Sequence, residues 1–248
     1  MTVQDDERER ELVRLFNLEW DPAHQRAGVD ALLRVQVGGA QCTLEVEVKS
    51  TTGDTVSTAR DVGMDHIEKW RSKLFVIGYY NREARRPELQ RCLCLTPADM
   101  APWIDSIAAK VAIDHQIAQR ACAKLQLDDL WAVCGQQPHY SMEDAKAVLR
   151  QQWSTQGYAS AADMADDCNG PSFSPAAMLD VLRIRARYIA ERGATLNNPH
   201  IPKRHLAAFS GSNREVLGDW AARIRAIATE WLAVSARSPL SPPSPFST

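Results

Sequence analysis

The stretch VDALLRVQVGGAQCTLEVEVKSTT (residues 29–52) has the pattern of a β-hairpin, and this hairpin decides the predicted fold. Apolar residues alternate with polar ones on both sides of a Gly-Gly pair, which is typical of two antiparallel strands joined by a tight turn. We expect the strands near residues 30–37 and 42–50. Successive side chains of a strand point to opposite faces, so Glu47 and Lys49 share one face of the second strand.

Asp30 begins the first of these strands, and the hairpin would place it beside Glu47 and Lys49. Two carboxylates a few ångströms apart repel each other, and a divalent cation relieves the repulsion. Mg²⁺ prefers such oxygen ligands and keeps several waters. An ammonium group beside the ion suits a phosphate, where it stabilises negative charge or adjusts the attacking water. The three side chains therefore favour phosphodiester hydrolysis.

The same charged strand has a simpler interpretation. Alternating charges usually mark a solvated face of a sheet, and a lysine–carboxylate pair there contributes less than about 1 kcal/mol. Hydrolysis of phosphate esters, by contrast, needs barrier lowering on the order of 20 kcal/mol, which side chains alone rarely provide. The hairpin by itself leaves both interpretations open.

A longer pattern resembles a known enzyme class. Asp30 followed by Glu47-Val48-Lys49 resembles the PD-(D/E)xK nuclease motif, with Val29 in its first place. The stretches LEVEVKSTTGDTVSTARDVGMDHIEKW (44–70) and RGATLNNPHIP (192–202) are similar to type II restriction endonucleases of that superfamily. The resemblance covers about residues 20–110 and 190–205, and it implies a restriction-endonuclease-like core.

The resemblance also implies roles for individual residues. Asp30 and Glu47 would hold Mg²⁺ with help from the carbonyl of Val48, and Lys49 would be the catalytic lysine. A water activated by the metal would attack phosphorus in line. We therefore expect a type II site-specific deoxyribonuclease that cuts both strands of double-stranded DNA and leaves 5′-phosphates. A palindromic target implies a two-fold homodimer.

Other acidic residues have open roles. Glu45 shares the face of Glu47 and is either a supporting acid or merely exposed. Many members of the superfamily recruit a glutamate from the first helix, and Glu11 and Glu19 are the candidates here. The spacing does not decide between them.

Several polar residues are candidates for DNA contact. Hydroxyl, amide and basic side chains bind phosphates, and asparagine or basic groups also recognise base edges in the major groove. Each group has a structural alternative: the end of a strand, an exposed amphipathic helix, or a turn between helices. The candidates are Ser50, Thr51, Arg60, His66, Lys69, Asn197, Asn198, His200, Lys203, Arg204 and Arg214.

Composition fits a globular protein with a basic flank. The chain has 248 residues, 45% hydrophobic residues and a net charge of −2. Residues 180–237 contain ten Lys or Arg and five Asp or Glu, so this flank carries +5 and the rest −7. A local positive field can attract a polyanion even when the whole chain is nearly neutral.

The motifs that the sequence lacks restrict the cofactors and the cellular location that we expect. The first 16 residues have no apolar run, so we expect no signal peptide, no membrane anchor and a bacterial cytoplasmic location. The six cysteines form no CxxC pair, which favours reduced thiols over a zinc site. No glycine-rich phosphate loop is present, so we expect no use of ATP.

The order of predicted elements indicates an α/β fold with a mixed central β-sheet flanked by helices and a mostly helical C-terminal half. We expect a catalytic core at 1–140, a helical region at 141–236 that adds DNA contacts, and a disordered Pro/Ser-rich tail at 237–248. Predicted helices lie at 97–110, 112–127, 142–153, 175–192 and 213–237, and a capping box is formed by Ser141 and Asp144.

Two rival functions remain. One is a DNA repair or recombination nuclease on the same fold, which would cut without a fixed sequence. The other is a non-catalytic DNA-binding protein, which would bind DNA but be indifferent to Mg²⁺ and to Lys49→Ala. The acids and the lysine at positions 30, 47 and 49 count against the second.

Overall fold

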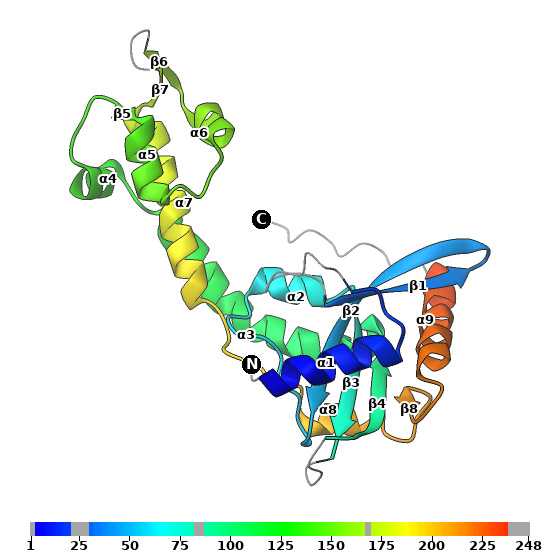
Figure 1. Cartoon of the computed structure of the whole chain (residues 1–248). Helices are drawn as coiled ribbons and strands as arrows, with labels where there is room; N and C mark the ends of the chain where they lie inside the picture. Colours follow the sequence, from blue (N-terminus) through cyan, green and yellow to red (C-terminus); the bar gives the residue numbers. More distant parts are fainter. Residues whose placement is uncertain (1–2, 21–29, 82–86, 167–169, 238–248) are drawn as a thin grey trace. The chain divides into compact units, whose positions relative to one another are not determined.

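The computed structural model describes residues 3–20, 30–81, 87–166 and 170–237 (Figure 1). Its strands are β1 (Ala31–Val37), β2 (Ala40–Thr51), β3 (Leu74–Tyr80), β4 (Leu89–Leu95), β5 (Tyr140–Ser141), β6 (Met164–Asp166), β7 (Gly170–Phe173) and β8 (Glu215–Val216). Its helices are α1 (Val3–Leu15), α2 (Met64–Trp70), α3 (Pro97–Ala123), α4 (Leu127–Cys134), α5 (Met142–Leu149), α6 (Thr155–Ala161), α7 (Pro175–Gly193), α8 (Lys203–Ala207) and α9 (Trp220–Arg237).

The described chain forms two compact units, one of residues up to 108 and from 197 onward, the other of residues 109–196. The first unit contains a mixed sheet with strand order β1-β2-β3-β4-β8. Strands β2 and β3 are parallel, and the other neighbours are antiparallel. This arrangement confirms the predicted α/β fold with a mixed sheet and flanking helices.

The predicted hairpin is present as β1 and β2, with its turn at Gly38 and Gly39. Both glycines have positive φ values, 57° and 85°, which the tight turn requires and which glycine adopts without strain. Antiparallel pairing runs from Val37 opposite Ala40 to Ala31 opposite Val46. The pairing register of the hairpin therefore also determines where Asp30, the residue that precedes β1, lies relative to β2.

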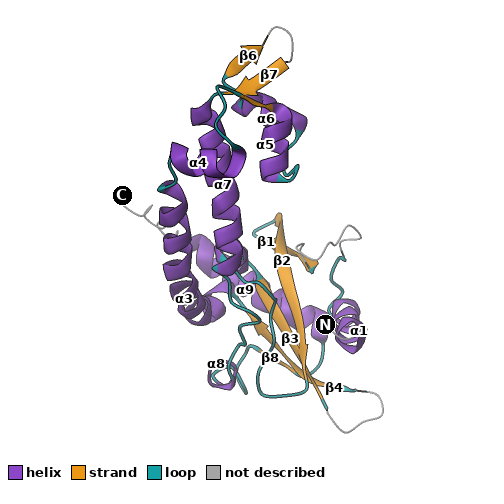
Figure 2. Cartoon of the chain, turned by 90° about the vertical axis from the view of Figure 1, so that its left-hand side faces the viewer, coloured by secondary structure: helices purple, strands orange, loops and turns teal. Residues whose placement is uncertain are grey.

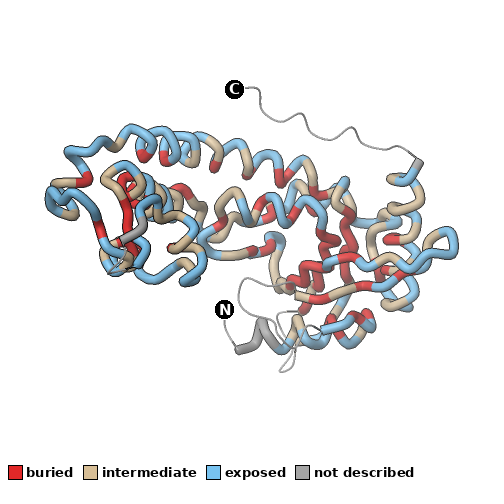
Figure 3. Tube along the Cα trace, turned by 90° about the horizontal axis from the view of Figure 1, so that it is seen from above, coloured by how far each residue is buried: buried red, intermediate tan, exposed pale blue. Residues whose placement is uncertain are grey.

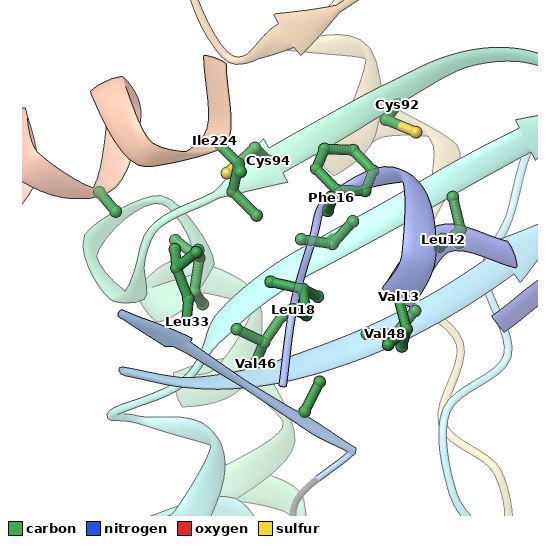
Figure 4. Packing of buried hydrophobic residues seen from close by; sticks show 14 of the residues in the cluster. Leu12, Val13, Phe16, Leu18, Leu33, Val46, Val48, Cys92, Cys94 and Ile224 are labelled. Carbon is green, nitrogen blue, oxygen red and sulfur yellow. The ribbon is translucent and has the colours of Figure 1, made fainter. Parts of the chain in front are cut away.

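One face of the large sheet carries the main hydrophobic core (Figure 4). Leu12 of α1 and Phe16, which directly follows this helix, are buried in one cluster with Val46 and Val48 of β2, and apolar residues of α9 complete it. A Cβ atom at Gly78 of β3 would lie 2.8 Å from a methyl carbon of Leu12, so the glycine allows α1 to approach the sheet. In keeping with this packing, the buried residues of the first unit are concentrated in the strands of the large sheet (Figure 3).

The opposite face of the sheet packs against α2 and the start of α3. The ring of Trp70 lies 6.3 Å from that of Phe75 on β3 and 5.2 Å from that of Trp103 on α3. Aromatic pairs at such separations add to the stability gained from burial. Because side chains alternate along β2, this second face is also the face of Glu47 and Lys49.

The second unit (Figure 2) has its own small sheet, with strand order β5-β7-β6. It also has its own hydrophobic core. The expected boundary at 140/141 does not coincide with the division of the two units at 108/109 and 196/197. Two expected helices, 97–110 and 112–127, are one helix, α3, which contains Pro102 and ends at Ala123. A proline near the start of a long helix removes one backbone hydrogen bond without ending it.

Other boundaries differ for local reasons. The capping box of Ser141 and Asp144 is present, with both reciprocal hydrogen bonds, and confirms the predicted start of α5. That helix ends at Leu149 rather than 153, because Arg150 adopts a left-handed conformation. The last helix begins at Trp220 rather than 213, since residues 215–216 pair with β4 as β8.

Some expectations fall on parts that the structure does not describe. Val29, which takes the first place of the nuclease motif, and residues 238–248 of the expected disordered tail lie outside the described residues. In the described ranges, no helix combines the length and the apolar character needed to cross a membrane.

Candidate active site

The hairpin register brings Asp30 to Glu47. Since Ala31 lies opposite Val46, the next residues along the two strands, Asp30 and Glu47, fall opposite each other on the other face of the sheet. Oδ2 of Asp30 accepts hydrogen bonds from the backbone N–H of Val48, at 3.0 Å, and from Nζ of Lys49, at 3.2 Å. The three predicted catalytic side chains therefore meet, as the nuclease interpretation requires.

The ammonium group of Lys49 is the centre of this cluster. Its nitrogen lies 3.2 Å from Oδ2 of Asp30, 3.0 Å from Oε1 of Glu47 and 3.0 Å from the carbonyl oxygen of Val48. Side-chain exposure is 8% for Lys49, 9% for Glu47 and 20% for Asp30. Three oxygens thus converge on one buried positive charge, and Asp30 is the most exposed of these three side chains.

A second lysine completes the cluster, in a place beside Glu47 that the hairpin pattern did not predict. Nζ of Lys73 lies 2.8 Å from Oε2 of Glu47, and the Lys73 side chain is 5% exposed. Phe75 lies beside Glu47 in the parallel pairing of β2 and β3. Two residues earlier along the same alternation, Lys73 points to the same face. The position of Lys73 next to a buried apolar strand was the signal that could have revealed it.

The charges of the cluster shift the pKa of its members. Burial alone would raise the pKa of Glu47, but the ammonium groups of Lys49 and Lys73 outweigh it and lower the pKa from 4.5 to about 2. Burial would lower the pKa of Lys49, yet the carboxylates of Glu47, Asp30 and Glu9 raise it above its ordinary value. At neutral pH the cluster therefore holds an ionised glutamate and a protonated lysine.

The donors of the cluster fit a hard divalent cation. In the described part of the chain no three His, Cys, Asp or Glu side chains are grouped as a metal site. The candidate instead combines two carboxylate oxygens, from Asp30 and Glu47, with the carbonyl oxygen of Val48, all within 3.2 Å of the Lys49 nitrogen. Oxygen donors of this kind suit Mg²⁺, whose remaining ligands are waters. In this structure the Lys49 ammonium lies among these three oxygens, at the position where the metal ion would bind.

The two glutamates considered as supporting acids pair elsewhere in the fold. Oε2 of Glu11 accepts a hydrogen bond from the hydroxyl of Tyr80, at 3.0 Å. Oε2 of Glu19 lies 2.8 Å from a guanidinium nitrogen of Arg34. Glu9 is instead among the carboxylates that raise the pKa of Lys49. Glu9 precedes Leu12 by three positions on the face of α1 that packs on the sheet, so the helical period could have indicated it.

The two hydroxyl residues after Lys49 have different surroundings. Side-chain alternation puts Ser50 on the face opposite Lys49, where its hydroxyl oxygen is buried without a hydrogen-bond partner among the described residues. The hydroxyl of Thr51 donates to the carbonyl of Thr55, at 2.8 Å, and accepts from the N–H of Gly53, at 3.0 Å. Thr51 thus holds the turn after β2, and its contact with DNA stays a prediction.

The two stretches that carry the resemblance lie side by side. Val56 and Ile201 form a backbone bridge, with N–O distances of 3.2 and 2.9 Å. The N–H of Thr58 donates to Oδ1 of Asn198, at 2.9 Å, and its hydroxyl donates to the carbonyl of Pro199, at 2.6 Å. The segment after β2 and the segment before α8 therefore form one hydrogen-bonded structure, although about 140 residues separate them in sequence.

Several polar residues in and after the second stretch form contacts within the fold. Nζ of Lys203 lies 3.0 Å from Oδ2 of Asp54 in an exposed pair. Nε of Arg214 lies 2.7 Å from Oδ2 of Asp99, and both side chains are mostly buried. The carbonyl of His200 accepts a hydrogen bond from the indole of Trp103, at 3.1 Å. These contacts give the residues structural roles, and DNA contact by them stays a prediction.

The remaining candidates lie at the surface. The side chains of Asn197, Arg204, Arg60 and Lys69 are exposed. His66 of α2 is partly buried against Trp70, with ring centroids 5.8 Å apart. Burial lowers the pKa of His66, and the charges of Glu47, Lys69, Lys73 and Lys49 also act on it. The charges of the cluster therefore reach the α2 histidine, and its contact with DNA stays a prediction.

Comparisons with protein-family models, curated proteins and solved structures gave no match for the chain.

Proposed function

We propose that the chain is a Mg²⁺-dependent type II restriction endonuclease of the PD-(D/E)xK class. It hydrolyses both strands of double-stranded DNA at a short specific site, leaves 5′-phosphates and needs no ATP. It acts as a homodimer in the bacterial cytoplasm, because a palindromic site calls for two copies related by a two-fold axis.

One observation carries this proposal. Oxygens of Asp30, Glu47 and Val48 surround a single buried position, which the Lys49 ammonium fills at 3.0 to 3.2 Å. An ion-pair ladder on a solvated strand would leave these groups exposed, whereas the side chains of Glu47 and Lys49 are only 9% and 8% exposed. Three charged residues of the cluster, Glu47, Lys49 and Lys73, are buried, and burying charge is costly unless the groups are paired. The support is strengthened by the hydrogen-bonded contact between the segments at 56–58 and 198–201.

The residues divide the chemistry between them. Asp30, Glu47 and the carbonyl of Val48 would hold Mg²⁺, which would supply Lewis acidity and an activated water for phosphodiester hydrolysis. Lys73 keeps Oε2 of Glu47 in place and favours its ionised form, so that Oε1 faces the ion site. The neighbouring carboxylates raise the pKa of Lys49 and keep it protonated, which suits it to stabilise charge on the phosphate.

The test is cleavage of plasmid DNA. The chain is incubated with plasmid and Mg²⁺ without ATP, and the ends of the fragments are sequenced. Discrete ends with 5′-phosphates at one short sequence support the proposal. Scattered ends would indicate a repair or recombination nuclease, and duplex binding without cleavage would indicate a non-catalytic DNA-binding protein.

Variants connect the activity to the site. Asp30→Asn and Lys49→Met should each reduce cleavage at least a thousandfold, because each removes a group from the cluster. Glu230→Gln is the matched control, since Glu230 is an exposed carboxylate on α9. Near-normal cleavage by either site variant would remove that residue from the proposed mechanism.

A further inference from the structure

The second unit contains a helix-turn-helix that the nuclease site does not use. Helix α5 is followed by the turn 150–154 and helix α6 (Figure 2). Helix α4 and strand β5 precede this pair, and strands β6 and β7 follow it. The small sheet has the order β5-β7-β6, so the strand before the helix pair and the hairpin after it close into one antiparallel sheet. This is the arrangement of a winged helix-turn-helix, in which the second helix is free to enter a groove.

One face of α6 packs against the hydrophobic core of the second unit. Tyr158 is the buried side chain of this helix and lies in the core of the unit with Leu149 of α5 and Phe173 of β7. The ring of Trp153, in the turn, lies 5.3 Å from the ring of Tyr158. The helix is therefore fixed to the unit through one face, and its other face points to solvent.

The solvent face of α6 carries polar side chains without charge. Thr155, Gln156 and Ser160 are exposed. Gln156 and Ser160 are four residues apart, and Nε2 of Gln156 lies 3.5 Å from the Ser160 hydroxyl, so they share one face. A glutamine amide can bond adenine at two positions, and hydroxyls can bond any base. The face thus has the chemistry of base recognition and lacks the large apolar groups of a protein interface.

Arg150, in the turn, is the basic residue of this motif that could reach a phosphate. Residues 145–162 contain no Asp or Glu and include Lys146 and Arg150, although Asp144 and Asp163 flank the segment and Lys146 pairs with Glu143 at 2.7 Å. The turn between the helices is also unusual in its backbone. Arg150 and Gln151 are exposed and adopt consecutive left-handed conformations, with φ values of 52° and 57°. Such conformations are costly for residues other than glycine and often mark functional positions.

We propose that the α5–turn–α6 motif is a second DNA-binding site, with α6 placed in the major groove of a duplex and Arg150 at the phosphate backbone. A helix of 10–12 Å diameter fits the groove, which is about 12 Å wide. The proposal rests on the proposed function, since it takes duplex DNA as the ligand. It also assigns base recognition to a part of the chain outside the 197–214 segment, where Asn198, Lys203 and Arg214 are engaged within the fold.

The test selects binding sites from a randomised duplex library, with the full chain and with Ca²⁺ in place of Mg²⁺. Gln156→Ala should lose the preference at one base position by about 5- to 100-fold, while the rest of the selected sequence is kept. Gln116→Ala is the matched control, because Gln116 is an exposed glutamine of α3 in the same unit. Arg150→Asn should lower the slope of log affinity against log salt by about 1, and the exposed Arg120→Asn should not.

The outcomes separate this inference from the nuclease proposal. If wild type cuts at a specific site but Gln156→Ala and Arg150→Asn behave as their controls, the inference is overturned and the nuclease proposal stands. If Gln156→Ala alters the selected sequence while Mg²⁺ gives no cleavage, the inference stands and the nuclease proposal fails. A chain that binds no duplex overturns both. A change in oligomeric state with unaltered site selection would assign the face to protein contact and overturn the inference.

Discussion

The ammonium nitrogen of Lys73 lies 2.8 Å from Oε2 of Glu47, and both side chains are buried. Lys49 occupies the other oxygen of the same carboxylate, at 3.0 Å. Glu47 is therefore the partner of two buried ammonium groups as well as a proposed metal ligand. We therefore expect removal of the Glu47 carboxylate to affect the stability of the fold as well as the chemistry. If the strand were a charged ladder that faces solvent, no such effect on the fold would be expected.

The first prediction concerns the pair of Lys73 and Glu47. Lys73→Met should lower the free energy of unfolding by about 3–5 kcal/mol, because it leaves one oxygen of a buried carboxylate unpaired. The double variant with Glu47→Gln should lose less than the sum of the two single variants. Chemical denaturation measures all three. Lys69→Met, at an exposed lysine of α2, is the control and should change the free energy by less than about 0.5 kcal/mol. Strict additivity in the double variant would show that the two side chains are not coupled.

The second prediction concerns acid stability. The pKa of Glu47 is lowered to about 2 in the fold from 4.5, so its ionised form contributes stability that is complete above pH 4.5 and is lost as pH falls towards 2. Glu47→Gln should therefore show a flatter loss of unfolding free energy between pH 4.5 and 2 than wild type. Glu45→Gln, at an exposed position of the same strand, should follow the wild-type slope. Equal slopes for Glu47→Gln and wild type would contradict the lowered pKa.

The third prediction concerns the contact between the two segments that carry the resemblance. Asn198 has a φ of 51°, and its side-chain oxygen accepts the Thr58 N–H at 2.9 Å. Asn198→Ala should lower the unfolding free energy by about 2–4 kcal/mol, from the lost hydrogen bond and the strained backbone. Asn198→Gly should lose less, since glycine tolerates the conformation. Thermal unfolding compares them, and a fully stable Asn198→Ala would make the contact dispensable.

The fourth prediction concerns phosphate contact by α2. Lys69 is exposed on the helix whose His66 borders the charged cluster. Lys69→Ala should weaken duplex binding uniformly across sequences and reduce the salt slope by about 1. The control is Lys110→Ala, at an exposed lysine of α3. Fluorescence anisotropy at several salt concentrations measures both, and an unchanged slope for Lys69→Ala would remove it from the interface.

The hairpin and the meeting of Asp30, Glu47 and Lys49 could be predicted from the sequence, because alternation and a Gly-Gly turn fix both register and face. The buried strand β3 has a different signal, the unbroken apolar run LFVIGYY, which is typical of a strand buried on both faces. The role of Lys73 was missed although alternation pointed to it, since a lysine beside a loop is usually solvated. The two predicted first-helix candidates, Glu11 and Glu19, instead pair with Tyr80 and Arg34, and the effect of Glu9 on the pKa of Lys49 depends on how α1 packs on the sheet.

Other features depend on tertiary structure that no local pattern encodes. The short strands β5, β6, β7 and β8 have between two and four residues each, too few for a periodic signal. The continuity of α3 through Pro102 is decided by packing rather than by helix propensity. The partners of Asn198, Lys203 and Arg214 come from distant segments, so the sequence offered no means of separating structural roles from DNA contact.

A titration with Mn²⁺, followed by the electron paramagnetic resonance signal of the free ion, tests the central claim most directly. That claim is that oxygens of Asp30, Glu47 and Val48 form one divalent-cation site, in which the Lys49 ammonium now lies. Wild type should bind Mn²⁺, and Asp30→Asn should bind it at least tenfold more weakly. Lys49→Met should bind it more tightly than wild type, because no ammonium competes for the same oxygens. Equal affinities for wild type and Asp30→Asn, or weaker binding by Lys49→Met, would contradict the account.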